Sequence, residues 1–339
     1  KHDYLNKSRQ IVMTWDIETY SSDRQTGEIP SPEAEDTNIF MICATFHWQF
    51  TEKALLKICC VDNPTSATPD VFFDMKALEA QSKTTGKPIE ELAREQSQVN
   101  VLIECGNERD LCIAFARVVS QMAPDFIGAF NGGSFDWPFY RERMHKYGLM
   151  RELYNCFSAL KPTYIENDTK KVGGKCSIYR WRFKEEKVKI SAEESATMLC
   201  AQFPGMIDTD IMIVFKQIYT KAEVGRGSSL NFYLKVNKLQ GKEDLPYKEM
   251  FHIYEKSSKW VERQKALERG DLTMFDIANT AELSDDDLQS IIKSHDKNGQ
   301  ENRDAMALVA KYCVVDAFRC QQLYTVKSII ADRKEVSNM

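Results

Sequence analysis

The sequence lacks several features that mark membrane, zinc-binding and secreted proteins. No stretch of about 18 apolar residues occurs, so we expect no membrane-spanning helix. Histidine is scarce, at five of 339 residues, and never forms an H-x-H or H-E-x-x-H pattern. The ten cysteines contain no C-x-x-C, which argues against a zinc site and indicates reduced thiols in an intracellular, reducing compartment. The first ten residues are polar and charged, unlike a signal peptide.

The chain also lacks the overall positive charge that is typical of proteins binding nucleic acid over a broad surface. Its net charge is −5. Basic side chains do gather in one segment, Lys170 to Lys189, which contains eight lysines and arginines and only two acidic residues, Glu185 and Glu186. This segment is either a solvated surface hairpin or a contact for nucleic-acid phosphates.

Apolar periodicity predicts an α/β fold with a mixed β-sheet flanked by helices. Hydrophobic residues make up 43% of the chain, enough for a substantial core. Several strands are followed by a strand–helix–strand–helix pattern, which indicates helices packed on a mixed sheet. Strands are expected over residues 10–19, 39–50, 54–61, 99–104, 125–130 and 205–209. Helices are expected over 107–122 and 136–147, and after the strand 205–209 as far as residue 219. Another helix is expected to begin at Ser284, and the longest is expected over 301–330.

Two further segments are expected to lie on the surface of that core. Residues 76–98 are polar and partly helical in pattern, with a break at Gly86-Lys87-Pro88. Residues 176–190 alternate between polar and apolar side chains, which predicts a β-hairpin with its turn near Glu185-Glu186. Either segment could be absent without loss of the core strands.

Three short acidic motifs carry the chemical information in the chain. Asp16-Ile17-Glu18 ends an apolar run, and alternation along a strand would place both carboxylates on one face. Taken alone, this motif favours a solvated strand end.

The second motif runs from Asn131 to Asp136, through Gly132-Gly133-Ser134-Phe135, into a helix that begins at Trp137-Pro138. Alone, Asp136 could simply cap that helix and Asn131 could be a turn residue. The third motif places Tyr312 and Asp316 four residues apart, on one face of a helix. A buried Asp316 needs a partner, which could be a metal ion or the hydroxyl of Tyr312.

Together the motifs offer four carboxylates and a phenol from a strand, a loop and a helix. Four carboxylates at one point repel one another unless a hard cation neutralises them, and oxygen ligands suit Mg²⁺ or Mn²⁺. Two such ions a few ångströms apart can hydrolyse phosphodiesters. The sequence therefore predicts a metal-dependent nuclease.

In this order the motifs resemble the DEDDy class of 3′–5′ exonucleases, which have an RNase H-like fold. Within that class they resemble the proofreading exonuclease domain of family B DNA polymerases, because Thr19, Trp137-Pro138 and Cys313 to Ala317 also match around them. A further similar stretch runs from Ser229 to Tyr247, and the likeness covers about residues 9–327.

The resemblance implies one exonuclease domain over residues 1–339, with helical insertions and a β-hairpin. The core would comprise about residues 9–150 and 200–330, and the insertions about 63–98, 160–195 and 255–303. Such insertions resemble those in polymerases of large DNA viruses. The hairpin at 176–190 would correspond to the strand-separating hairpin of the family, or else be an ordinary surface hairpin.

The resemblance also implies a site for two Mg²⁺ or Mn²⁺ ions. The metal ligands would be Asp16, Glu18, Asp136 and Asp316. Asp16 would bridge the two ions, and Tyr312 would orient the attacking water. A single-stranded or frayed DNA 3′ end would be the substrate, with its terminal nucleotide in contact with Asn131, Phe135 and Thr19. The product would be a 5′-mononucleotide.

Asp208-Thr209-Asp210 copies the D-T-D of the polymerase catalytic motif, but the Tyr-Gly that normally precedes it is missing. The chain ends soon after the third motif, where a polymerase palm would begin, so we expect no nucleotidyl transfer from it. Asp210 is expected to cap a helix beside the cleft. The expected partners are the palm and thumb domains of a parent polymerase, and a sliding clamp is a further candidate. The expected location is the nucleus or a viral replication site in the cytoplasm.

Two other functions stay open at this point. One is a DEDDy exonuclease that trims RNA 3′ ends, since nothing in the sequence identifies what reads a 2′-hydroxyl. The other is an idle exonuclease fold that binds DNA or acts as a scaffold. Loss of a carboxylate would indicate the idle fold, and none of the four is missing.

Overall fold

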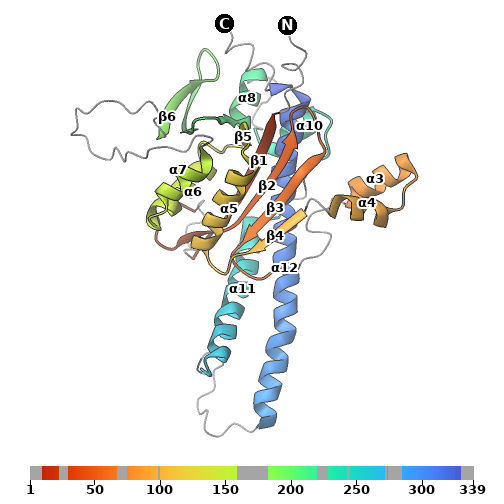
Figure 1. The fold of residues 1–339 in the computed structure, drawn as a ribbon, viewed down its shortest axis with the longest axis vertical. Helices are drawn as coiled ribbons and strands as arrows, with labels where there is room; N and C mark the ends of the chain where they lie inside the picture. The colour runs from red at the N-terminus through yellow and green to blue at the C-terminus, as the bar shows by residue number, and fades with distance from the viewer. Residues whose placement is uncertain are drawn as a thin grey trace, which may run out of the picture.

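A six-stranded mixed sheet with helices on both faces forms the centre of the protein, among the residues that the structure describes (Figure 1). The computed structural model describes residues 10–22, 30–66, 75–97, 100–158, 182–219, 228–242, 245–271, 273 and 285–329. The mixed sheet flanked by helices confirms the predicted fold class. Within these ranges no helix has the length and apolar character needed to cross a membrane.

The order of strands in the sheet is β4-β3-β2-β1-β5-β8. Their bounds are β1 (Ile11–Ser21), β2 (Thr37–Trp48), β3 (Ala54–Val61), β4 (Asn100–Glu104), β5 (Phe126–Ala129) and β8 (Ile207–Asp210). Strands β1, β5 and β8 run parallel, whereas β2 is antiparallel to β1 and β3, and β4 is parallel to β3. The carboxyl ends of β1, β5 and β8 therefore share one edge, the usual place for a site in such a sheet.

Alternate side chains of β1 enter two different cores. Met13, Trp15 and Ile17 are buried in the larger one. The helices on that side are α5 (Glu108–Met122), α6 (Asp136–Lys146) and α7 (Met150–Phe157). The intervening residues face α12 (Asp285–Val326), which crosses the other side of the sheet (Figure 1).

One hydrogen bond fixes the register of α12 against β1. The hydroxyl of Thr14 donates to the carbonyl of Ala317 over 2.7 Å, although the two residues are 303 positions apart. Thr14 also lies 3.0 Å from the hydroxyl of Thr45 on β2. Because Thr14 is buried two residues before Asp16, this contact brings Asp316 close to the first acidic motif.

A β-bulge interrupts the pairing of β1 with β2 beside that motif. Glu18 pairs with Met41 and Thr19 with Ile39, which leaves Phe40 as an extra residue. Bulges re-aim side chains and are common next to functional sites. Here both Phe40 and Met41 are buried on the α12 side, which strict alternation would not allow.

Two helices, α11 (Tyr247–Glu268) and the first half of α12, extend side by side beyond the sheet as an arm (Figure 1). The indole N–H of Trp260 donates to the carbonyl of His295 over 3.0 Å, and the two rings stack with centroids 5.3 Å apart. This packing ties the arm together.

The expected start of the longest helix at residue 301 is wrong, because α12 is continuous from Asp285 to Val326. Gly299 does not end a helix here. A Cβ atom at Gly299 would lie 2.6 Å from the ring of Trp260, so the glycine provides the space that the ring occupies. Ser284, the expected cap, lies outside the described residues.

The polar segment between β3 and β4 in the sequence forms two short helices, α3 (Met75–Thr85) and α4 (Ile89–Ser97) (Figure 1). Gly86 separates them with φ of +73°, a conformation that favours glycine. Leu78 and Leu92 form a small core of their own. The predicted helical pattern and its break at Gly86 are confirmed.

Strands β6 (Arg182–Lys189) and β7 (Ser195–Gln202) form a separate antiparallel hairpin. The expected turn at Glu185-Glu186 is wrong, because both residues pair with β7 in the middle of β6. The turn lies at residues 190–194, where the Ser191 hydroxyl accepts from the N–H groups of Glu193 and Glu194. This local bonding explains the position of the turn. Residues 170–181 of the basic segment lie outside the described residues.

Helices α8 (Ile211–Ile218) and α10 (Leu230–Val236) pack with the end of α12 into a third core. Asp210 precedes α8 and its side chain accepts from the N–H of Ile213, as expected for a helix cap.

Candidate metal centre and nuclease site

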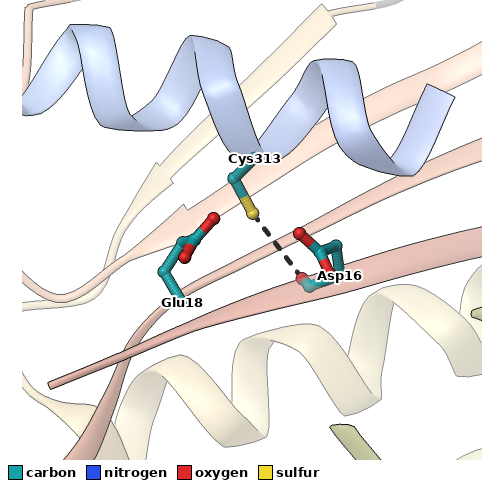
Figure 2. A group of neighbouring side chains, drawn as sticks. All are labelled: Asp16, Glu18 and Cys313. Atoms are coloured by element: carbon teal, nitrogen blue, oxygen red, sulfur yellow. Dashed lines mark hydrogen bonds between the residues drawn. The ribbon is translucent and has the colours of Figure 1, made fainter. Parts of the chain in front are cut away.

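Two carboxylates and a thiol meet where α12 crosses β1 (Figure 2). One ligand atom from each of Asp16, Glu18 and Cys313 lies within 4.8 Å of the other two. Figure 2 shows Cys313 reaching down from α12 between the two acidic side chains of β1. The thiol of Cys313 donates to the backbone carbonyl of Asp16 over 3.7 Å. Glu18 is 6% exposed, whereas Asp16 keeps more contact with solvent.

Asp136 approaches the same place from α6, of which it is the first residue. Its side chain is 2% exposed. Burial, together with the negative charges of Asp210 and Asp208, raises its pKa to about 8, although hydrogen bonds from its own N–H and that of Ile17 oppose the shift. The bond from Ile17 places Asp136 against the backbone between Asp16 and Glu18.

Asp316 and Tyr312 enter from α12 and share one cation, Lys242. The ammonium of Lys242 donates to Asp316 Oδ2 and to the Tyr312 hydroxyl, each over 2.7 Å. Lys242 lies in the segment between α10 and α11, and its side chain is 16% exposed. Burial alone would lower the pKa of Lys242, but Asp316 and Tyr312 raise it overall. The lysine is therefore held in its charged form.

The acidic groups interact strongly with one another. Burial, and then the negative charges of Asp136, Glu18 and Asp316, raise the pKa of Asp16 well above its usual range. Desolvation followed by the charge of Asp316 does the same to Glu18. Lys242 opposes both shifts. Without added cations, one ammonium faces four carboxylates.

The donor set fits a hard divalent cation. Within the described part of the chain, the buried atoms Glu18 Oε1 and Asp136 Oδ1 accept no hydrogen bond. A buried carboxylate oxygen without a donor is costly, and a metal ion would satisfy it. Asp16, Glu18, Asp136 and Asp316 offer only oxygen, as Mg²⁺ and Mn²⁺ prefer.

Cys313 does not change this preference. Burial, and then the negative charges of Glu18 and Asp16, raise the pKa of its thiol, although a hydrogen bond with Cys43 opposes them. A protonated thiol is a poor ligand for a hard ion. The position of Cys313 between Asp16 and Glu18 is explained instead by its hydrogen bond to the strand backbone.

The three residues expected to contact a nucleotide differ in exposure. Asn131 and Phe135 lie partly exposed on the loop between β5 and α6. Asn131 has φ of +66°, the left-handed region in which asparagine is favoured among residues other than glycine. Thr19 follows the bulge and is only 4% exposed, so it has little surface to offer.

The contact of Lys242 with the acidic cluster was not predicted from the sequence. Lys242 lies in the stretch from Ser229 to Tyr247 that resembles the family, but its neighbours show no periodic pattern. Its contact with Asp316 joins residues 74 positions apart. The only available signal was the lysine's presence in that family-like stretch.

The mixed sheet flanked by helices is that of the RNase H-like exonuclease fold. Comparison with known families agrees. The chain belongs to the exonuclease domain family of DNA polymerase family B, which matches residues 2–217.

Similar proteins come from large DNA viruses. Over 326 residues, 96% of this chain, it is 28% identical to proteins named DNA polymerase beta from two isolates of African swine fever virus. It covers 19% and 20% of those two proteins. Over 101 residues, 27% of this chain, it is 28% identical to the DNA polymerase catalytic subunit of varicella-zoster virus, of which it covers 8%. The chain thus spans only a small part of the relatives it matches.

Proposed function

We propose that the chain hydrolyses the last phosphodiester bond at DNA 3′ ends and releases 5′-mononucleotides. The observation that carries this proposal is the convergence of Asp16, Glu18, Asp136 and Asp316 at one edge of the sheet. Membership of the family B exonuclease domains supports the same activity.

The chemistry follows from the acidic cluster and its tyrosine. Two Mg²⁺ or Mn²⁺ ions held by the four carboxylates would lower the pKa of a water molecule and stabilise the leaving 3′-oxygen. Tyr312 positions the attacking water by a hydrogen bond. Its hydroxyl already accepts from Lys242, and a hydroxyl that accepts from an ammonium becomes a stronger donor. Lys242 thereby orients both Tyr312 and Asp316.

The loop between β5 and α6 would bind the terminal nucleotide. Phe135 is partly exposed and offers a ring for packing or stacking on a base, and Asn131 offers an amide for hydrogen bonds. Frayed or single-stranded ends would be preferred, because separating a paired terminal base costs a few kcal/mol. Thr19 would contribute through its place beside Glu18 rather than through exposed surface.

DNA is the proposed substrate because the relatives are named DNA polymerases. In a longer protein this chain would act beside palm and thumb domains as a proofreading exonuclease during DNA replication. A sliding clamp as partner stays a prediction. The insertions are proposed to be residues 63–98, 160–195 and 255–303, which include α3, α4, β6 and most of the arm.

The activity can be tested with labelled oligonucleotides. Single-stranded DNA labelled at the 5′ end would be incubated with the chain and Mg²⁺, and then with EDTA. We expect a ladder shortened from the 3′ end with Mg²⁺ and none with EDTA. The Asp16→Ala, Glu18→Ala double variant should lose this activity. RNA of the same sequence tests the alternative of RNA trimming.

A matched control is the Glu33→Ala, Glu35→Ala double variant. It removes two carboxylates at the same spacing from exposed positions, so it should degrade DNA like the wild type. Equal degradation by the wild type and the Asp16, Glu18 variant would refute the proposal. Faster shortening of RNA than of DNA would replace the proposed substrate.

A further inference from the structure

Asp210, at the end of β8, contacts the loop that carries Asn131 and Phe135. Asp210 is 5% exposed. Its Oδ1 accepts from the N–H of Asn131 over 3.2 Å, and its Oδ2 accepts from the N–H of Gly133 over 3.1 Å. The same Oδ1 accepts from the N–H of Ile213, the helix-capping bond, over 3.2 Å.

Asp208 contacts Trp137, the residue that follows Asp136. Its Oδ1 accepts from the indole N–H of Trp137 over 3.0 Å, and its Oδ2 accepts from the N–H of Ala201 over 3.0 Å. The loop residues Asn131 and Gly133, which precede Asp136, and Trp137, which follows it, are therefore bound to two carboxylates of one short strand.

Backbone hydrogen bonds also shape this loop, because the N–H groups of Ser134 and Phe135 donate to the carbonyl of Asn131 over 3.1 Å. A Cβ atom at Gly132 would lie 2.5 Å from the Cβ of Ala129, and one at Gly133 would lie 2.8 Å from Met198, so both glycines are tightly enclosed. The N–H groups of Asn131 and Gly133 point towards Asp210 and away from any strand ladder. Buried N–H groups require acceptors, and here a single side chain supplies both.

We propose that Asp210 is a positioning residue of the nuclease site, which fixes the loop before Asp136 so that this carboxylate can bind a divalent ion. The proposal rests on the proposed function. Capping α8 uses the backbone N–H groups of Ile213 and Met212, whereas the two bonds to the loop serve the neighbouring motif. Asp208 supports the same arrangement through Trp137. The negative charge of both residues also favours a cation at Asp136.

The two roles of Asp210 can be separated by the substitution Asp210→Ser. Serine is a good helix cap, but its single, shorter hydroxyl cannot bridge to Asn131 and Gly133. The matched control is Asp125→Ser, at the opposite end of β5, where Asp125 Oδ2 accepts from the N–H of Ile11 over 2.8 Å. Each substitution shortens an aspartate that binds a backbone N–H.

The readout is Mn²⁺ binding by calorimetry in the absence of nucleic acid, with hydrogen exchange of the peptide spanning residues 129–137. For Asp210→Ser we expect about tenfold weaker Mn²⁺ binding, the usual effect of losing a group that orients a metal ligand. Amide exchange in that peptide should become faster. Asp125→Ser should leave both quantities at their wild-type values.

Wild-type Mn²⁺ affinity in Asp210→Ser would overturn the proposal and leave Asp210 as a helix cap alone. If this variant does not fold, Asp210→Asn decides by the same measurements, because it keeps the side-chain volume and one acceptor. Failure of the wild type to degrade DNA would refute the proposed nuclease. In that case Mn²⁺ binding and hydrogen exchange of the Asp210→Ser variant would still test whether Asp210 positions the loop.

Discussion

Replacing Lys242 by methionine tests whether the acidic cluster depends on its one cation. The substitution keeps an unbranched side chain of similar length and removes the ammonium that contacts Asp316 and Tyr312, each over 2.7 Å. Metal-free protein at pH 8 is the sensitive condition, since Lys242 is the cation that offsets the charges of Asp16 and Glu18 among the residues that the structure describes. We expect the variant to fold less stably than the wild type there.

The magnitude follows from burial. The side chains of Lys242 and Asp316 are 16% and 8% exposed, so this is a buried ion pair. Removing one partner of such a pair costs about 3–5 kcal/mol. At about 2.1 cal/mol/K per residue, the unfolding entropy of 339 residues is about 0.7 kcal/mol/K. The unfolding temperature should therefore fall by about 4–7 °C.

The assay is thermal unfolding by calorimetry in EDTA and in Mn²⁺. Added Mn²⁺ should stabilise the Lys242→Met variant more than the wild type, because the ion replaces the missing charge. The fall in unfolding temperature should also be smaller at pH 6, because carboxylates with raised pKa values can then be neutralised by protons in place of the missing ammonium. A wild-type unfolding temperature in EDTA at pH 8 would refute this reasoning.

Lys184→Met is the matched control for that experiment. Lys184 pairs with Glu186 over 2.8 Å, but its side chain is 47% exposed. Exposed ion pairs contribute about 0–1 kcal/mol, so the unfolding temperature should change by about 1 °C or less. A loss as large as that of Lys242→Met would mean that burial does not distinguish the two pairs.

Two further predictions concern the same cluster. Tyr312→Phe should lower the rate of DNA degradation by about tenfold, the worth of one hydrogen bond of about 1.4 kcal/mol, while calorimetric Mn²⁺ affinity stays unchanged. A wild-type rate would remove the Tyr312 hydroxyl from the mechanism. The metal-free protein should lose stability as the pH rises from 6 to 8. Asp136 has a pKa of about 8 when folded, against an ordinary value of 3.8, so folding takes up a proton in this range. Unfolding temperatures in EDTA measure the slope, which Asp136→Asn should flatten; a rise with pH in the wild type would contradict the assignment.

Local periodicity was enough to predict which acidic side chains share a face. Asp16 and Glu18 are two apart on a strand, and Tyr312 and Asp316 are four apart on a helix. For each pair, a correct prediction of that one strand or helix was enough to place both side chains on the same face. The six strands of the main sheet also followed from the apolar pattern, because most of them are strongly hydrophobic, whereas α7 and β7 were not predicted. These parts of the fold depend on neighbours in the sequence.

The unpredicted features depend on contacts between distant residues. Gly299 lies inside α12, where its missing side chain leaves room for the ring of Trp260 on another helix. The bulge after Glu18 depends on the pairing of β1 with β2. Lys242 meets Asp316 through the tertiary fold alone. None of these contacts leaves a periodic signal near its own residues.

The charge of the proposed site explains why it needs both its lysine and its metals. When all four proposed ligands are ionised, they and the ammonium of Lys242 carry a net charge of −3, which would repel the anionic backbone of DNA. With two divalent ions the net charge becomes +1, and the single negative charge of the scissile phosphodiester then neutralises it. Without Lys242 the same two ions would only balance the carboxylates, and the phosphate would enter a neutral site. Lys242 therefore gives the site its attraction for substrate as well as holding Asp316 and Tyr312 in place.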